Sequence, residues 1–174
     1  YANLCRLITE AHLDQEDRRN PRLDFASLEA RHDGLIVLSG CRSGLLPRVL
    51  QTEGMAAARR FADRCRAVFG HDRFFVELQR NAVRGDQGIT RALADVADHE
   101  RLSVVATGDV HYHQRERHRL HDALVAIRHR TTLDGSHNAR KPNGEFYLRR
   151  PEEAQALFRD RPDAISNTTT IAER

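Results

Sequence analysis

The sequence has no tryptophan, one methionine and only three cysteines, Cys5, Cys41 and Cys65. An odd number of cysteines without C-x-x-C spacing argues against a disulfide framework, so we expect a cytoplasmic protein. No apolar run approaches the length of a membrane-spanning helix, and no signal-peptide pattern opens the chain. The sequence therefore predicts no membrane partner.

The chain also lacks a large excess of either positive or negative charge. The 28 basic residues, of which only Lys141 is a lysine, are interspersed with 25 acidic ones, and the formal net charge is +3. No segment of the chain is a run of basic residues, which argues against a strong DNA-binding surface on this chain alone. With 174 residues, 40% of them hydrophobic, the chain can form a globular domain with a real core.

What is present is an alternation of short apolar runs and amphipathic segments. The runs at residues 35–38, 74–78 and 103–106 have the length and composition of buried strands. Helical spacing of apolar residues occupies the segments between them, most clearly at 55–69. This alternation predicts an α/β fold with parallel strands. The chain opens in a helical pattern without a capping residue, so we expect it to be a piece of something longer.

Each apolar run ends in a side chain that can bind metal. Cys41 and Glu77 follow or close the first two runs, and Asp109 with His111 follows the third. The carboxyl ends of parallel strands meet on one face, where α/β proteins place their chemistry. Asp109 and His111 point to the same side of an extended chain. A carboxylate and an imidazole together suit Zn, Mn or Fe, and a thiolate suits structural Zn.

Each of these residues also has an ordinary structural interpretation. Cys41 could be a small buried residue of its turn, Glu77 could pair with Arg80 or another arginine, and Asp109 could cap the helix that follows. His113 is a candidate outer-shell residue beside the metal ligands. Three further histidines are expected on a solvated helix face: His118, His121 and His129. No G-x-S-x-G, P-loop, G-x-G-x-x-G or H-E-x-x-H motif is present.

Four segments resemble a known family in order and spacing. They are residues 34–44 (GLIVLSGCRSG), 74–78 (FFVEL), 104–112 (VVATGDVHY) and the tail from 147 (YLRRPEEA). Together they resemble the polymerase and histidinol phosphatase (PHP) domain of bacterial DNA polymerase III alpha subunits. The DVHYH run followed by RHRLHDAL is similar to the error-prone branch of that family.

The resemblance implies part of an irregular (β/α)7 barrel. Residues 1–150 would be the C-terminal portion of the PHP domain, and 151–174 the start of the connection to the polymerase body. Family metal ligands match Cys41, Asp109 and His111, while Glu77 lies on a matching motif and His113 beside it. The early family motifs, including a His-x-His pair, are absent, so the chain supplies only part of a metal cluster.

The same resemblance implies the function. The parent would be an error-prone DNA-directed DNA polymerase that uses Mg, DNA and dNTPs and contacts other polymerase or mutasome subunits. Its PHP domain would be a metal-dependent phosphoesterase, a candidate 3′–5′ exonuclease, with this chain alone inactive. Two alternatives stay open. The domain is a non-catalytic module that braces the polymerase, or it is a stand-alone PHP-type phosphoesterase, which fits the polymerase-like tail badly.

Overall fold

The computed structural model describes residues 1–13 and 20–174. Its helices are α1 (Ala2–Leu13), α2 (Phe25–Ala30), α3 (Leu45–Glu53), α4 (Met55–Phe69), α5 (Asp86–Glu100), α6 (His118–Arg128), α7 (Pro151–Leu157) and α8 (Pro162–Ala172). Two short 3-10 helices, η1 (Arg115–Arg117) and η2 (Asp134–Ala139), flank α6 in the sequence. The strands are β1 (Val37–Leu38), β2 (Phe74–Gln79) and β3 (Ser103–Thr107).

The three strands form one parallel sheet in the order β1-β2-β3. Val37 pairs with Phe74, and Glu77 pairs with Val105. The first three side chains of β2 are all buried, as expected for a parallel strand covered on both faces. The predicted alternation of parallel strands with helices is confirmed, although β1 is shorter than the apolar run at 35–38.

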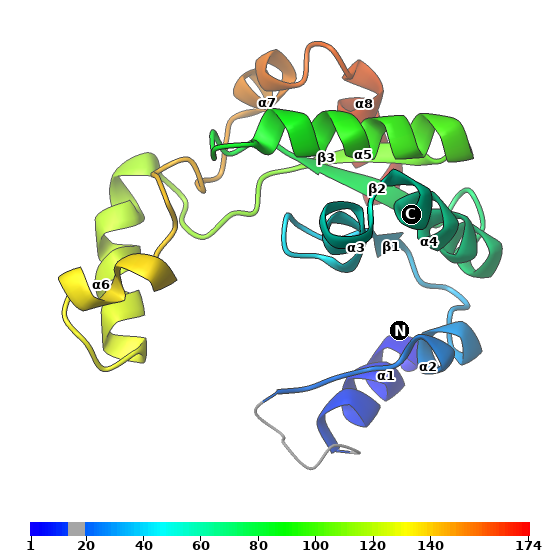
Figure 1. The fold of residues 1–174 in the computed structure, drawn as a ribbon, viewed down its shortest axis with the longest axis horizontal. Coiled ribbons are helices and arrows are strands. Elements are labelled where there is room, and N and C mark those ends of the chain that lie inside the picture. The colour runs from blue at the N-terminus through cyan, green and yellow to red at the C-terminus, as the bar shows by residue number, and fades with distance from the viewer. Residues whose placement is uncertain (14–19) are drawn as a thin grey trace.

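Helices α4 and α5 cover the sheet through small and aliphatic side chains. Ala58, Ala62 and Cys65 of α4 are buried in the core, where their small size allows close approach to neighbouring elements. Leu93 and Val96 of α5 join the same core. Helix α5 packs against β2 and against α4 (Figure 1). The amphipathic pattern read at residues 55–69 corresponds to α4 residue for residue.

At the C-terminal end of the chain, α8 packs onto β3, the edge strand on the other side of the sheet from β1. Helix α8 lies against β3, and the Asn167 side-chain amide donates a hydrogen bond of 2.8 Å to the Val104 carbonyl oxygen. Phe158 is 2% exposed and Ala164 is fully buried, and both belong to the main core. The segment from Pro151 therefore contributes apolar side chains to the same core as the sheet.

Helix α6 lies at one end of the molecule, away from the sheet (Figure 1). It contacts η1 and η2, and its side chains Leu120, Leu124 and Ile127 are more than half exposed. The described residues supply three parallel strands, which do not close a barrel by themselves. Within the described part of the chain, no helix is long and apolar enough to cross a membrane.

Candidate functional site

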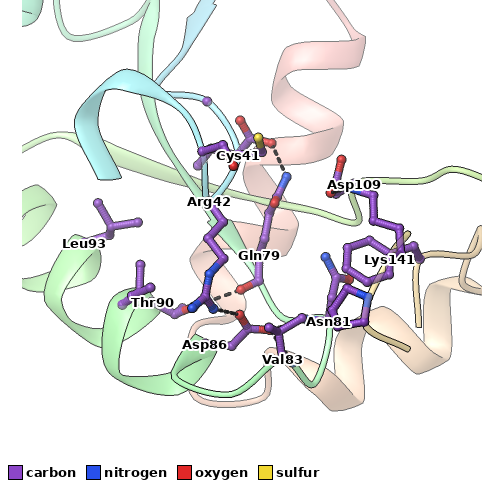
Figure 2. Close-up of a pocket in the computed structure, with 16 residues that line it drawn as sticks. Cys41, Arg42, Gln79, Asn81, Val83, Asp86, Thr90, Leu93, Asp109 and Lys141 are labelled. Carbon is purple, nitrogen blue, oxygen red and sulfur yellow. Dashed lines mark hydrogen bonds and ion pairs between the residues drawn. The ribbon is translucent and has the colours of Figure 1, made fainter. Parts of the chain in front are cut away.

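A pocket of about 280 Å³ lies at the carboxyl end of the sheet. Residues at or beyond the carboxyl-terminal halves of the three strands line it: Glu77 lies within β2, and Cys41 and Asp109 follow β1 and β3. Figure 2 shows Lys141 beside Asp109, and Arg42 extending from its turn toward Asp86. The pocket therefore gathers three side chains that are far apart in the sequence, as the topology of parallel strands predicts.

Cys41 lies in a tight turn that depends on glycine. Gly40 has φ +91°, which L side chains rarely adopt. A Cβ atom on Gly44 would lie 2.8 Å from the Gly40 Cα atom and 2.8 Å from the Cys41 carbonyl oxygen. The turn leads into α3, whose Pro47 falls in the first turn where its missing N–H is tolerated. Cys41 is a half-buried free thiol.

Glu77 is held by neutral donors. Its Oε1 atom accepts hydrogen bonds from the Thr107 hydroxyl and, at 2.8 Å, from the Gln79 side-chain amide. Arg80, the cation suggested for Glu77 by the sequence, instead makes a bidentate ion pair with Asp160 at 2.6 and 2.8 Å. The ion-pair interpretation of Glu77 is therefore wrong for Arg80.

Asp109 lies between two cationic or potentially cationic partners. Its Oδ1 atom is 3.3 Å from His111 Nε2, and its Oδ2 atom is 2.8 Å from the Lys141 ammonium nitrogen. The Asp109 backbone has φ +46°, a left-handed conformation that costs less for Asp and Asn than for most residues. Asp109 does not cap the next helical segment, because that segment begins after Gln114.

His111 is fixed by backbone and aromatic contacts. The His111 backbone N–H donates a hydrogen bond to the Phe146 carbonyl oxygen at 2.8 Å. The His111 ring packs edge-on against the His121 ring, with centroids 5.2 Å apart. The buried Nδ1 atom of His121 has no hydrogen-bond partner among the described residues. Burial, followed by the nearby His111, lowers the pKa of His121. The expectation of a solvated His121 is therefore wrong.

Two of the predicted site residues do not line the pocket. His113 is exposed and does not line the pocket, and His111 stands next to Asp109 without lining it either. Sequence reasoning missed Lys141 and the Arg42–Asp86 ion pair of 2.5 Å. Lys141 lies shortly after η2, within the polar segment that begins at residue 134. Its rarity as the single lysine was the only available signal.

Asp109 and His111 fit as two ligands of one metal ion. On a tetrahedral ion with bonds of about 2.0–2.1 Å, neighbouring ligand atoms lie roughly 3.3 Å apart. The Asp109 Oδ1 and His111 Nε2 atoms are separated by 3.3 Å. In the described part of the chain, however, no three His, Cys, Asp or Glu side chains form a group that could hold a metal ion. The described residues thus bring together two side chains at ligand spacing and no third one.

Comparison with known proteins finds a domain family and several relatives. Residues 1–81 match the PHP domain family. The whole chain is 40% identical to part of the error-prone DNA polymerase of Symbiobacterium thermophilum, of which it covers 17%. It is also 34% identical to part of the DNA polymerase III alpha subunits of Thermus aquaticus and Escherichia coli, of which it covers 14% and 15%. The chain thus spans about one-sixth or less of these relatives.

Proposed function

Because the chain carries PHP-domain sequence that matches DNA polymerase III alpha subunits and error-prone DNA polymerases, we propose that it forms part of a metal-dependent phosphoesterase site in an error-prone DNA polymerase. A 3′–5′ exonuclease that removes the terminal nucleotide of a DNA strand is the activity best suited to that context. The observation that carries the proposal is the pocket at the strand ends, with Asp109 and His111 at ligand spacing.

Asp109 and His111 would hold a divalent Zn, Mn or Fe ion. Cys41, from the neighbouring turn, would have to move closer to serve as a third ligand, because no three such side chains are grouped in the described part of the chain. Such an ion, when bound, activates water and neutralises charge on the phosphoester. Glu77 has a positioning role, because its Oε1 atom already accepts hydrogen bonds from Thr107 and Gln79. These bonds tie the end of β2 to β3 and fix the wall of the pocket. His113 would act as an outer group near the metal.

The wider protein follows from the same proposal. Residues 1–150 would complete a (β/α)7 PHP barrel with strands supplied from elsewhere in the polymerase, and 151–174 would begin the connection to the polymerase body. That body would use Mg, dNTPs and DNA for synthesis, and other polymerase or mutasome subunits would contact it. The formal net charge of +3 leaves most DNA binding to the rest of the protein.

A second function, a non-catalytic module that braces the polymerase, has its own support. Lys141 already neutralises Asp109, and no group of three metal-binding side chains occurs in residues 1–13 and 20–174. In that case the site would hold the fold together without turning over substrate. The two functions differ in what the Asp109→Asn substitution removes.

The test measures metal content and exonuclease activity on the longer polymerase and its Asp109→Asn variant, with Glu152→Gln at an exposed position as the control. A catalytic site predicts that Asp109→Asn loses metal and at least about a hundredfold of the 3′–5′ exonuclease rate at an unchanged melting temperature. A bracing module predicts a lower melting temperature with no exonuclease activity in either protein. Equal metal content and equal exonuclease activity in all three proteins would contradict the catalytic proposal.

A further inference from the structure

Asn143 lies in the loop between η2 and α7, and it is the only asparagine of the sequence that precedes a glycine. At such a step the following backbone nitrogen can attack the side-chain carbonyl carbon, because glycine has no Cβ atom to obstruct the approach. The attack forms an N–Cγ bond and breaks the bond from Cγ to the amide nitrogen. That nitrogen takes the proton of the Gly144 N–H and leaves as ammonia. Water then opens the resulting succinimide ring, which gives aspartate or isoaspartate.

The structure does not require a glycine at position 144. The Gly144 backbone lies outside the left-handed region that favours glycine. A Cβ atom there would lie 3.5 Å from Arg115 Cγ and 3.5 Å from His118 Nδ1, which are ordinary van der Waals distances. Alanine would therefore fit at this position, and packing does not explain why the asparagine is followed by the one residue that favours ring closure.

The Asn143 side-chain amide is fully engaged in the folded chain. Its Nδ2 atom donates hydrogen bonds to the carbonyl oxygens of Asn81 at 2.8 Å and Ala82 at 3.1 Å. Its Oδ1 atom accepts a hydrogen bond of 2.9 Å from the Glu145 backbone N–H. Ring closure expels Nδ2, so it breaks both bonds to the carbonyl oxygens. We therefore expect the reaction to proceed from molecules in which this loop has opened.

The same two hydrogen bonds anchor one wall of the pocket. Lys141, Pro142 and Phe146 line the pocket from this loop, and Asn81 lines it from the end of β2 (Figure 2). An aspartate at position 143 has no N–H group to donate. Its negatively charged oxygen would face the two carbonyl oxygens that the amide now satisfies, and the unmet acceptors cost stability. The loop would then lose its attachment to the end of β2.

We propose that Asn143 is a deamidation site, that the docked loop protects it, and that its conversion irreversibly releases the pocket wall formed by residues 141–146. Water is the only co-reactant. Isoaspartate has a further effect, because it inserts an extra methylene group into the backbone between this residue and Gly144. The modification therefore changes the pocket by detaching a loop, and it does so only in chains whose loop has already opened.

The experiment incubates the 174-residue chain in mildly alkaline buffer with and without guanidinium chloride. Peptide mass spectrometry follows the change from amide to acid at each asparagine, and an isoaspartate assay identifies the second product. In denaturant Asn143 should convert faster than every other asparagine. In the folded chain its conversion should be at least about tenfold slower, because only opened molecules react.

Gly144→Ala and Asn143→Asp separate the chemistry from its structural effect. Gly144→Ala should melt as the wild type does and lose most of the conversion in denaturant. Asn143→Asp should lower the melting temperature by about 3–10 °C and speed the hydrogen exchange of residues 141–146. Asn138→Asp is the matched control, because it makes the same change at an exposed residue of η2 and should alter neither quantity.

Each part of the proposal has an outcome that overturns it. Slow conversion of Asn143 in denaturant overturns the modification site. Equal rates in the folded and denatured chain overturn the protection by the loop. Wild-type melting and exchange in Asn143→Asp overturn the release of the pocket wall. If that variant does not fold, converted wild-type chain is separated from unconverted chain by its extra charge, and the two exchange rates are compared directly.

Discussion

The three cysteines lie in three different environments. Cys5 is exposed, Cys41 is half-buried at the pocket, and Cys65 is 3% exposed between α4 and the core. Burial raises the pKa of the Cys65 thiol to about 12. The thiolate is the reactive form, so the three thiols should differ widely in reactivity.

We predict two fast thiols and one protected thiol at pH 8. With a chromogenic disulfide reagent, Cys5 and Cys41 should react within minutes, whereas Cys65 should react only as the protein opens or is denatured. Replacing Cys5 and Cys41 by serine should remove the fast phase and leave a single slow equivalent. Three equivalents in the fast phase of the wild type would show that α4 does not shield Cys65.

At the scale of elements, the C-terminal helices are held by both apolar and ionic contacts. Arg80 pairs with Asp160 and stacks over the Phe158 ring at 4.7 Å, and Arg161 pairs with Asp98 of α5 at 3.1 Å. The Arg80 side chain lowers the pKa of Asp160 to about 2, so this ion pair persists through ordinary pH values. These pairs lie at the surface, and the buried Phe158 ring contributes more to stability.

We expect Phe158→Ala to destabilise the chain by about 3–5 kcal/mol, the usual cost of removing a buried aromatic ring. Urea unfolding followed by circular dichroism measures this difference. Leu148→Ala, at a residue that is 64% exposed, should change stability by less than about 0.5 kcal/mol. A small loss at Phe158 would mean that 151–174 unfolds separately from the sheet, as expected of a connecting segment.

How far the sequence predicts each element depends on how local its signal is. The helix at 55–69 and the strand around Phe74 carry their apolar pattern within a few residues, and both were predicted. The pairing of Lys141 with Asp109 spans 32 residues and depends on the path of an irregular loop. The contact of His121 with His111 depends on how α6 folds back on the chain before it. Neither leaves a periodic pattern in the sequence.

The parallel topology explains why part of the site could nevertheless be predicted. Cys41 and Asp109 follow β1 and β3, and Glu77 lies near the carboxyl end of β2. Parallel pairing brings such positions to one edge of the sheet irrespective of the loop conformations. The position of His113 could not be predicted from strand pairing, because β3 ends at Thr107 and the chain after Asp109 leaves the sheet.

At the scale of the whole molecule, apolar side chains remain exposed on two separate elements. Leu4 and Ile8 of α1 are 44% and 52% exposed, and Leu124 and Ile127 of α6 are 56% and 71% exposed. Helical spacing places Leu124 and Ile127 on one face. Exposed apolar side chains that share a helix face favour association between proteins.

We predict that the 174-residue chain self-associates as its concentration rises, and that Leu124→Gln combined with Ile127→Gln lowers the association at least about tenfold. Light scattering coupled to size exclusion measures the mass across a concentration series. Leu45→Gln serves as the control, because Leu45 is 53% exposed on a different helix. A chain that stays monomeric throughout the series would show that the α6 face does not drive self-association.

The left-handed backbone at Asp109 restricts which substitutions can isolate its chemistry. At φ +46°, a β-branched or bulky replacement adds backbone strain to the loss of the carboxylate. An alanine substitution at this position would therefore combine two effects in one number, whereas Asn tolerates the left-handed backbone and changes only the side-chain head, removing its charge and exchanging one acceptor oxygen for an amide donor. For the same reason, a lineage that no longer needs the carboxylate has Asn and Gly as its least disruptive replacements, so sequence drift at this position should be narrow even after the chemistry is lost.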